Sequence, residues 1–142
     1  MIWPHGRDHP TPYPPGIHHT AIIVPGTVIG ANPRIGPYAV VGSPGEHSDR
    51  REWNFGNVVI GDNVTIHEYG HVQSGFDRPT VLGDDVLLMA NAHVAHDCQV
   101  GDRVTLSPNV VLGGSVVLED DVTVGINTSI HQRSIVRARS MI

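Results

Sequence analysis

The sequence predicts an all-β protein, a parallel β-helix built from hexapeptide repeats. An aliphatic residue returns every six positions, a period that fits neither the 3.6-residue turn of an α-helix nor the alternation of a simple strand. A small or β-branched residue follows four places after most of them, as Cys98 follows Val94. Gly, Asp and Asn gather directly after the aliphatic position, where a corner needs turn conformations. The longest run comprises Leu82, Leu88, Val94, Val100, Leu106, Leu112, Leu118, Val124, Ile130, Val136 and Ile142.

Each hexapeptide is expected to form one flat face of a prism, so three of them make a coil of about eighteen residues. Asp84, Asp102 and Asp120 are eighteen residues apart and should therefore stack in one corner. Asp62 lies twenty-two residues before Asp84. The four extra residues indicate an insertion near residues 76–79.

The chain divides into a short lead-in and one repeat domain. Residues 1–16 are rich in Pro, Gly and His and precede the first repeat, and residues 17–142 form the β-helix. Loop excursions are expected at 42–57 and 73–81, where the period breaks. The first excursion is charged and contains Trp53, which fits either a solvated insertion or a flap lining a groove. The last repeat position, Ile142, has no capping segment after it, so we expect a truncated form.

Composition narrows the possible functions. The 142 residues are 39% hydrophobic with only two Phe, two Trp and three Tyr, which suits a single domain with a slim aliphatic core. The net charge is −5 and no basic run occurs, which argues against a nucleic-acid partner. No apolar segment has the length of a membrane span, so a cytoplasmic protein is expected. Cys98 is the single cysteine, which excludes an intrachain disulfide and favours a packed thiol.

One segment places two His and one Asp around a coil corner. His96 precedes Gly114 by eighteen residues, so its imidazole should lie one coil away from that glycine, about 4.8 Å in strand spacing. A neutral His can accept a proton near pH 7, and a Gly N–H can stabilise an oxyanion. This pair predicts acyl transfer. The alternative is that His96 and Asp97 only form a hydrogen-bonded corner.

The run Leu-Leu-Met-Ala-Asn-Ala-His-Val-Ala-His-Asp-Cys-Gln at 87–99 closely resembles the catalytic coil of bacterial UDP-N-acetylglucosamine O-acyltransferases of lipid A synthesis. The resemblance covers most of residues 17–137. It implies a left-handed parallel β-helix that forms a homotrimer with active sites between subunits. The family's C-terminal helical domain has no counterpart in this chain.

The resemblance also implies roles for particular residues. His96 is similar to the general base of the family, Asp97 to its supporting carboxylate, and the amide of Gly114 to the oxyanion donor. His93 and His131 match cleft-lining positions, and we also expect Asn91 and Ser115 to contact the substrate. Ser115 stands where those enzymes carry another His.

The function that the resemblance implies is the transfer of an acyl group to a hydroxyl or amine of a nucleotide-linked amino sugar. The donor is an acyl carrier protein or acyl-CoA, with no bound cofactor and no metal. The stretch 106–114 is also similar to sugar N- and O-acetyltransferases, which use acetyl-CoA. Neither the acyl chain length nor the choice between N- and O-acylation follows from the sequence.

Two other functions fit the same architecture. A gamma-class carbonic anhydrase binds zinc through His residues of neighbouring subunits, and His67, His71, His93 and His96 suggest such a site. The spacing His93-x-x-His96 and the adjoining Asn91 and Asp97 fit an acyltransferase better. A non-catalytic β-helix scaffold is the third possibility, favoured by Ser115 and by the missing C-terminal domain.

Overall fold

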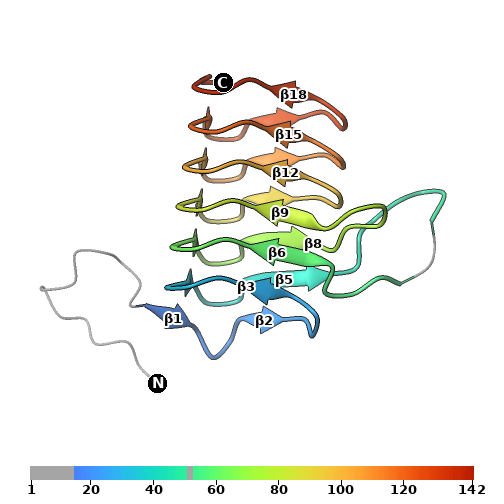
Figure 1. Ribbon diagram of the computed structural model, residues 1–142, viewed down its shortest axis with the longest axis vertical. Helices are drawn as coiled ribbons and strands as arrows, with labels where there is room; N and C mark the ends of the chain where they lie inside the picture. The colour runs from blue at the N-terminus through green and yellow to red at the C-terminus, as the bar shows by residue number, and fades with distance from the viewer. Residues whose placement is uncertain (1–14, 51–52) are drawn as a thin grey trace, which may run out of the picture.

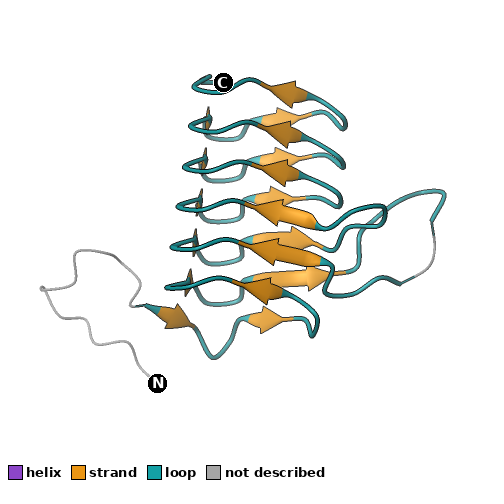
Figure 2. Ribbon diagram, in the orientation of Figure 1, coloured by secondary structure: helices purple, strands orange, loops and turns teal. Residues whose placement is uncertain are grey.

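The protein is a stack of short parallel strands in three sheets, seen in a computed structural model that describes residues 15–50 and 53–142 (Figures 1 and 2). Residues 1–14, most of the expected lead-in, lie outside this range. The first sheet contains β1 (Gly16–Ile17), β4 (Arg34–Ile35), β7 (Thr65–Ile66), β10 (Leu87–Leu88), β13 (Thr105–Leu106) and β16 (Thr123–Val124). The second contains β2 (Ile22–Ile23), β5 (Val40–Ser43), β8 (His71–Gln73), β11 (His93–Val94), β14 (Val111–Leu112) and β17 (Ser129–Ile130). The third contains β3 (Val28–Ile29), β6 (Val58–Ile60), β9 (Thr80–Leu82), β12 (Gln99–Val100), β15 (Val117–Leu118) and β18 (Ile135–Val136).

The strand register follows the hexapeptide period. Each strand pairs with the strand one coil away, so Leu88 lies opposite Leu106 and Val94 opposite Leu112. Because these partners are eighteen residues apart, every third repeat shares a sheet, which confirms the predicted parallel β-helix.

The core is a narrow column of aliphatic side chains inside the prism. Leu88, Leu106 and Leu112 are fully buried. Ala92 and Cys98, from the column of smaller residues, are buried beside them. Burying one such Leu contributes about 1.5–3 kcal/mol, and the column repeats this gain in every coil.

The corners use backbone conformations that few residues adopt. Asp85, Asn91 and Asp97 have φ of 57°, 59° and 62°, in the left-handed region that Asn and Asp tolerate best. The predicted aspartate stack lies at one corner. Asp102 accepts a hydrogen bond from the N–H of Asp84 (2.9 Å), and Asp120 accepts one from the N–H of Asp102 (2.9 Å).

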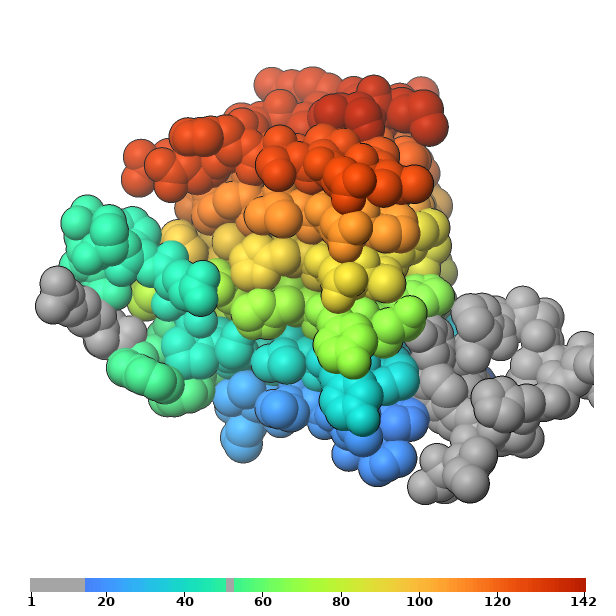
Figure 3. Space-filling view, turned by 180° about the vertical axis from the view of Figure 1, so that it is seen from behind, coloured from blue at the N-terminus to red at the C-terminus, as the bar shows by residue number. Residues whose placement is uncertain are grey.

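Two loops break the eighteen-residue offset. The longer one lies between β5 and β6, and its described residues, 44–50 and 53–57, project from one side of the stack (Figures 1 and 3). The shorter one, residues 74–79, connects β8 and β9. Both loops are shorter than the excursions expected at 42–57 and 73–81, because Ser43 still pairs with Gln73 and Val58 with Thr80.

The long loop folds back toward the stack. A Cβ on Gly45 would lie 2.7 Å from the Phe76 ring and 2.8 Å from Cβ of His96, so only Gly fits at this approach. Asn54 fastens the loop, since its Oδ1 accepts from the N–H of Gly45 (3.1 Å) and its Nδ2 donates to the carbonyl of Gly75 (2.7 Å).

The described part of the chain contains no helix with the length and apolar character of a membrane span.

Candidate active site

His96 and Asp97 form a buried pair at the corner that follows β11. Nδ1 of His96 lies 2.7 Å from Oδ2 of Asp97, and both residues are buried. The N–H of His96 donates to Oε1 of Gln73 (3.3 Å), and the N–H of Asp97 donates to the hydroxyl of Thr80 (2.9 Å). The dyad is therefore fixed by the preceding coil.

The Asp97 carboxylate is held ionised by hydrogen bonds. Its Oδ1 accepts from the N–H groups of Asp77 (2.8 Å) and Arg78 (3.1 Å), both in the short loop. Burial raises the pKa of this carboxyl, but the bond from His96 and the two backbone bonds outweigh it and lower the pKa overall. An ionised carboxylate only accepts hydrogen bonds, so in the neutral imidazole of His96 the proton resides on Nδ1 and Nε2 is unprotonated.

Gly114 lies beside the imidazole ring of His96, as the eighteen-residue offset predicts. A Cβ at position 114 would be 2.6 Å from Nε2 of His96 and 2.5 Å from Cε1, so no side chain fits there. The N–H of Gly114 donates no hydrogen bond to any residue that the structure describes. An unprotonated ring nitrogen and an unengaged amide thus lie beside one another.

A cleft of about 550 Å³ opens beside His96 and Gly114. It runs along the second sheet between the stack and the long loop. Its walls come from the loop, from β8 and β11, and from the two coils above them. The lining residues are Glu46, His47, Ser48, Gln73, His93, Ala95, His96, Val111, Leu112, Gly113, Gly114, Ser129, Ile130, His131 and Gln132.

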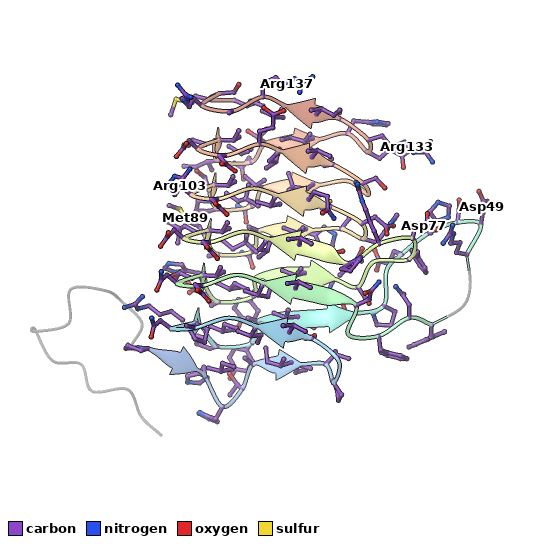
Figure 4. The ribbon with its side chains drawn as sticks, in the orientation of Figure 1. Asp49, Asp77, Met89, Arg103, Arg133 and Arg137 are labelled. Atoms are coloured by element: carbon purple, nitrogen blue, oxygen red, sulfur yellow. The ribbon has the colours of Figure 1, made fainter. Side chains whose placement is uncertain are left out.

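A second cavity, of about 340 Å³, also borders His96 and is lined by several charged side chains. Asp49, Asp77 and Arg133 line it and lie on the loop side of the stack (Figure 4). Arg50 also lines it and forms an ion pair with Asp77 (2.6 Å). His96 and Gly114 border both cavities.

The structure brings most of the expected site residues together. His93 and His131 line the cleft with His96 and Gly114, while Ser115 lines the charged cavity. Asn91 lines neither of these two cavities; it is an exposed corner residue whose N–H donates to the carbonyl of Glu68 (3.1 Å).

Sequence reasoning missed the groups that surround the imidazole from the loops. The rings of Phe76 and His47 lie edge-on to His96, with centroids 5.2 Å and 5.5 Å away. Gln73 is buried, and its Nε2 has no hydrogen-bond partner among the described residues. Phe76 and His47 lie where the period breaks, so no repeat offset points to them.

His71 and His93 form a second imidazole pair. Their Nδ1 atoms are 3.1 Å apart, and Nε2 of His71 lies 2.6 Å from the hydroxyl oxygen of Ser43. Their separation of twenty-two residues equals that of Asp62 and Asp84, which is the signal that could have paired them. Within residues 15–50 and 53–142 of one chain, no three His, Cys, Asp or Glu side chains converge as a metal site.

Cys98 is packed into the core directly after the dyad. Its Sγ donates a hydrogen bond to the carbonyl of Gly113 (3.2 Å). Burial, assisted by the nearby Asp97 charge, raises the pKa of the Cys98 thiol to about 11. The thiol is therefore protonated at neutral pH and is a poor nucleophile.

The three-sheet stack with a His-Asp dyad at one corner defines the class of hexapeptide-repeat proteins. Residues 79–114 match the family "Bacterial transferase hexapeptide (six repeats)". The chain belongs to this hexapeptide-repeat family, and its fold is the left-handed parallel β-helix that the resemblance implied.

The relatives are acyltransferases acting on UDP-N-acetylglucosamine. The acyl-[acyl-carrier-protein]–UDP-N-acetylglucosamine O-acyltransferase of Campylobacter concisus is 43% identical over 110 residues, or 75% of this chain and 42% of that protein. The enzyme of the same name from Rhizobium johnstonii is 40% identical over 117 residues, covering 79% and 42%. The chain thus spans about two fifths of the length of these relatives.

Solved structures show the same similarity. LpxA from Acinetobacter baumannii superposes with a TM-score of 0.63 at 30% identity, over 89% of this chain and 66% of that one. The UDP-N-acetylglucosamine acyltransferase of Francisella novicida has a TM-score of 0.68 at 23% identity, over 89% and 60%. The latter supports the fold alone.

Proposed function

We propose that the chain is an acyltransferase that moves an acyl group from a thioester to a hydroxyl or amine of a nucleotide-linked amino sugar. The observation that carries this proposal is the His96 imidazole, whose Nδ1 is bound to Asp97 while Nε2 lies beside Gly114, a residue whose N–H is unengaged among the described residues. General acid–base groups and oxyanion donors in this arrangement are what acyl transfer needs.

The reaction proceeds by direct attack within the cleft. Nε2 of His96 takes the proton of the acceptor hydroxyl or amine as its oxygen or nitrogen attacks the thioester carbonyl carbon. Asp97 stabilises the resulting imidazolium through Nδ1. The N–H of Gly114 donates to the oxyanion, and when the C–S bond breaks, His96 returns the proton to the leaving thiolate. No enzyme nucleophile is required, which agrees with the protonated state of Cys98.

The relatives favour one pair of substrates. Their names specify an acyl carrier protein as donor and UDP-N-acetylglucosamine as acceptor. We propose the same chemical class of substrates here, with His93 and His131 binding the sugar from the cleft wall and Ser115 contacting ligand from the charged cavity. The carrier-linked donor and acyl-CoA present the same thioester to the attacking acceptor.

We further propose that three copies associate through the third sheet. The outer positions of its strands are aliphatic in β3, β6, β9, β15 and β18, namely Val28, Val59, Val81, Val117 and Ile135. Val28 and Ile135 are each 58% exposed. The outer position of β12 is Gln99, which interrupts the apolar stripe once. An exposed apolar stripe of this kind is typical of a surface that a partner covers, and a second copy of the chain supplies the same stripe.

A thioester-release assay tests the activity. Purified protein is incubated with acyl carrier protein and coenzyme A thioesters of several chain lengths, each with and without UDP-N-acetylglucosamine and related UDP-sugars. We expect thiol release that depends on the acceptor for at least one pair. A lack of release with every pair would contradict the proposal and favour a non-catalytic scaffold.

Metal analysis with a carbon dioxide hydration assay tests the carbonic anhydrase alternative, for which we expect no activity.

A further inference from the structure

Ser43, His71 and His93 form a hydrogen-bonded chain that leads into the cleft but lies outside the His96 dyad. Ser43 ends β5, His71 begins β8 and His93 begins β11, so the three residues lie on successive strands of the second sheet. The hydroxyl of Ser43 contacts Nε2 of His71, and Nδ1 of His71 contacts Nδ1 of His93. Nε2 of His93 makes no hydrogen bond to any described residue, and His93 lines the cleft.

The two contacts are coupled through the proton positions of the imidazoles. A neutral imidazole carries one N–H and one acceptor nitrogen, so the two Nδ1 atoms can share only one proton. If Ser43 donates to His71, then His71 is protonated at Nδ1, His93 accepts there, and Nε2–H of His93 points to the ligand. If the chain runs the other way, Nε2 of His93 is an acceptor. Whether Nε2 of His93 donates or accepts is therefore set by Ser43, which lies two residues away along the hydrogen-bonded chain.

The hydrogen bonding of Ser43 favours the first direction. Ser43 Oγ lies 2.6 Å from Nε2 of His71, a separation short enough for a hydrogen bond. Ser43 Oγ has no second hydrogen-bond partner among the described residues, so only the direction in which Ser43 donates to His71 gives its hydroxyl proton a partner there.

The charge beside the cleft favours the same direction. Glu46 lines the cleft together with His93, and its charge acts on both imidazoles. A nearby carboxylate stabilises a proton on the nitrogen that faces the cleft. Burial nevertheless lowers the pKa of both His71 and His93, with Glu46 opposing it, so the pair is neutral at pH 7 and the tautomer argument applies.

We propose that Ser43 and His71 are positioning residues that hold His93 as the Nε2–H tautomer, so that it donates a hydrogen bond to an acceptor oxygen of the bound substrate. This inference rests on the proposed function for the identity of the substrate, a sugar hydroxyl or carbonyl oxygen. The proposed tautomer of His93 is independent of that function, because it concerns the protein without substrate.

Long-range ¹H–¹⁵N NMR of the ¹⁵N-labelled protein at about pH 8, above the ordinary His pKa, reads the tautomer directly. The His93 signals are assigned by their loss in His93→Gln. We expect wild-type His93 to show a protonated Nε2 and an unprotonated Nδ1, with the reverse pattern for His71. A protonated Nδ1 in wild-type His93 would overturn the proposal.

Three variants separate the hydroxyl from general effects on the fold. Ser43→Ala should give averaged signals from both tautomers of His93, while Ser43→Thr, which keeps the hydroxyl, should retain the wild-type pattern. Ser107→Ala, at a serine that does not line the cleft, is the matched control and should leave His93 unchanged. Unaltered His93 signals in Ser43→Ala, with the protein folded, would also contradict the proposed relay from Ser43 through His71 to His93.

Steady-state kinetics of the same variants distinguish failure of the relay from failure of the proposed activity. Ser43→Ala should raise KM for the sugar acceptor about fivefold, the effect of one weakened hydrogen bond, and leave kcat within about twofold, because His96 is untouched. Ser43→Thr should restore KM. If the wild type transfers no acyl group to any acceptor, the activity is wrong and the NMR result still decides the relay. Equal KM values in Ser43→Ala and wild type would refute the relay.

Discussion

Asp97 combines two requirements in one side chain. It adopts the left-handed corner conformation, with φ of 62°, and its carboxylate accepts hydrogen bonds from His96 and from the short loop. An Asn also tolerates this conformation. Replacement by Asn therefore isolates the charge and the tautomer from the backbone geometry.

We predict that Asp97→Asn lowers kcat about 10²-fold or more while the fold persists. The N–H of the new side-chain amide can donate to Nδ1 of His96, which allows the tautomer that is protonated at Nε2 and cannot act as the base. The neutral amide also no longer stabilises the imidazolium. Steady-state kinetics of the variant measure the loss, with circular dichroism as the check on folding. Full activity in a folded Asp97→Asn would show that the dyad is only a structural corner.

Gly114, which lies beside the imidazole of His96, gives a second prediction. Gly114→Ala should displace the His96 ring, because the new Cβ would lie 2.6 Å from Nε2. We expect kcat to fall by at least about tenfold. Gly125→Ala is the matched control, since a Cβ there lies 3.0 Å or more from its neighbours and outside the cleft. A Gly114→Ala enzyme as active as the control would contradict the proposed contact.

At the residue scale, the sequence predicted what the repeat offset connects. His96 and Gly114 are eighteen residues apart and meet in successive coils. The amides of Asp77 and Arg78 that bind Asp97 come from the inserted loop, where the offset does not apply. The surroundings of the dyad therefore depend on a loop conformation that periodicity does not encode.

Among the structural elements, the aspartate corner tests how the coils are held in register. Asp102→Ala removes the acceptor for the N–H of Asp84 (2.9 Å) at an exposed position. We expect a loss of about 0.5–1.5 kcal/mol in unfolding free energy, the usual net value of one hydrogen bond. Urea denaturation followed by circular dichroism measures it. A change within about 0.3 kcal/mol would show that water replaces the carboxylate without cost.

The pairing of strands β8 and β11 should make stability depend on pH. His71 has a folded pKa below its usual 6.5 because of burial, opposed by Glu46. Between the two pKa values the unfolded chain binds more protons than the folded one, so stability is present above about pH 6.5 and declines as pH falls. His71→Gln should flatten this decline between about pH 8 and pH 5.5. Parallel denaturation curves for variant and wild type would contradict the shift.

For the strands, the six-residue period predicted where each one lies but not where it ends. The loop 74–79 contains four extra residues, which shift the offset from eighteen to twenty-two, yet pairing resumes with Thr80 opposite Val58. The sequence marks the length of an insertion because the aliphatic positions are displaced by that number. It does not mark how far backbone pairing continues into the loop, because those hydrogen bonds are independent of side-chain type.

The whole molecule is predicted to assemble through its apolar sheet. Wild-type protein should sediment at about three times the chain mass of 15.3 kDa. Val117→Lys places a charge on the stripe of the third sheet and should yield single chains, whereas Thr105→Lys, at an outer position of the first sheet, should not. A wild type that sediments as a single chain, or a Val117→Lys variant that keeps the trimer, would contradict the proposed surface.

His96 is the proposed general base of the acyl transfer. The direct measurement is mass-spectrometric detection of acylated UDP-N-acetylglucosamine formed from an acyl carrier protein thioester by wild type and by His96→Ala, each checked for assembly state. Acylated product from the wild type and a loss of at least about 10²-fold in His96→Ala, with assembly unchanged, is the predicted result. Equal product formation by both proteins would contradict the assignment of His96.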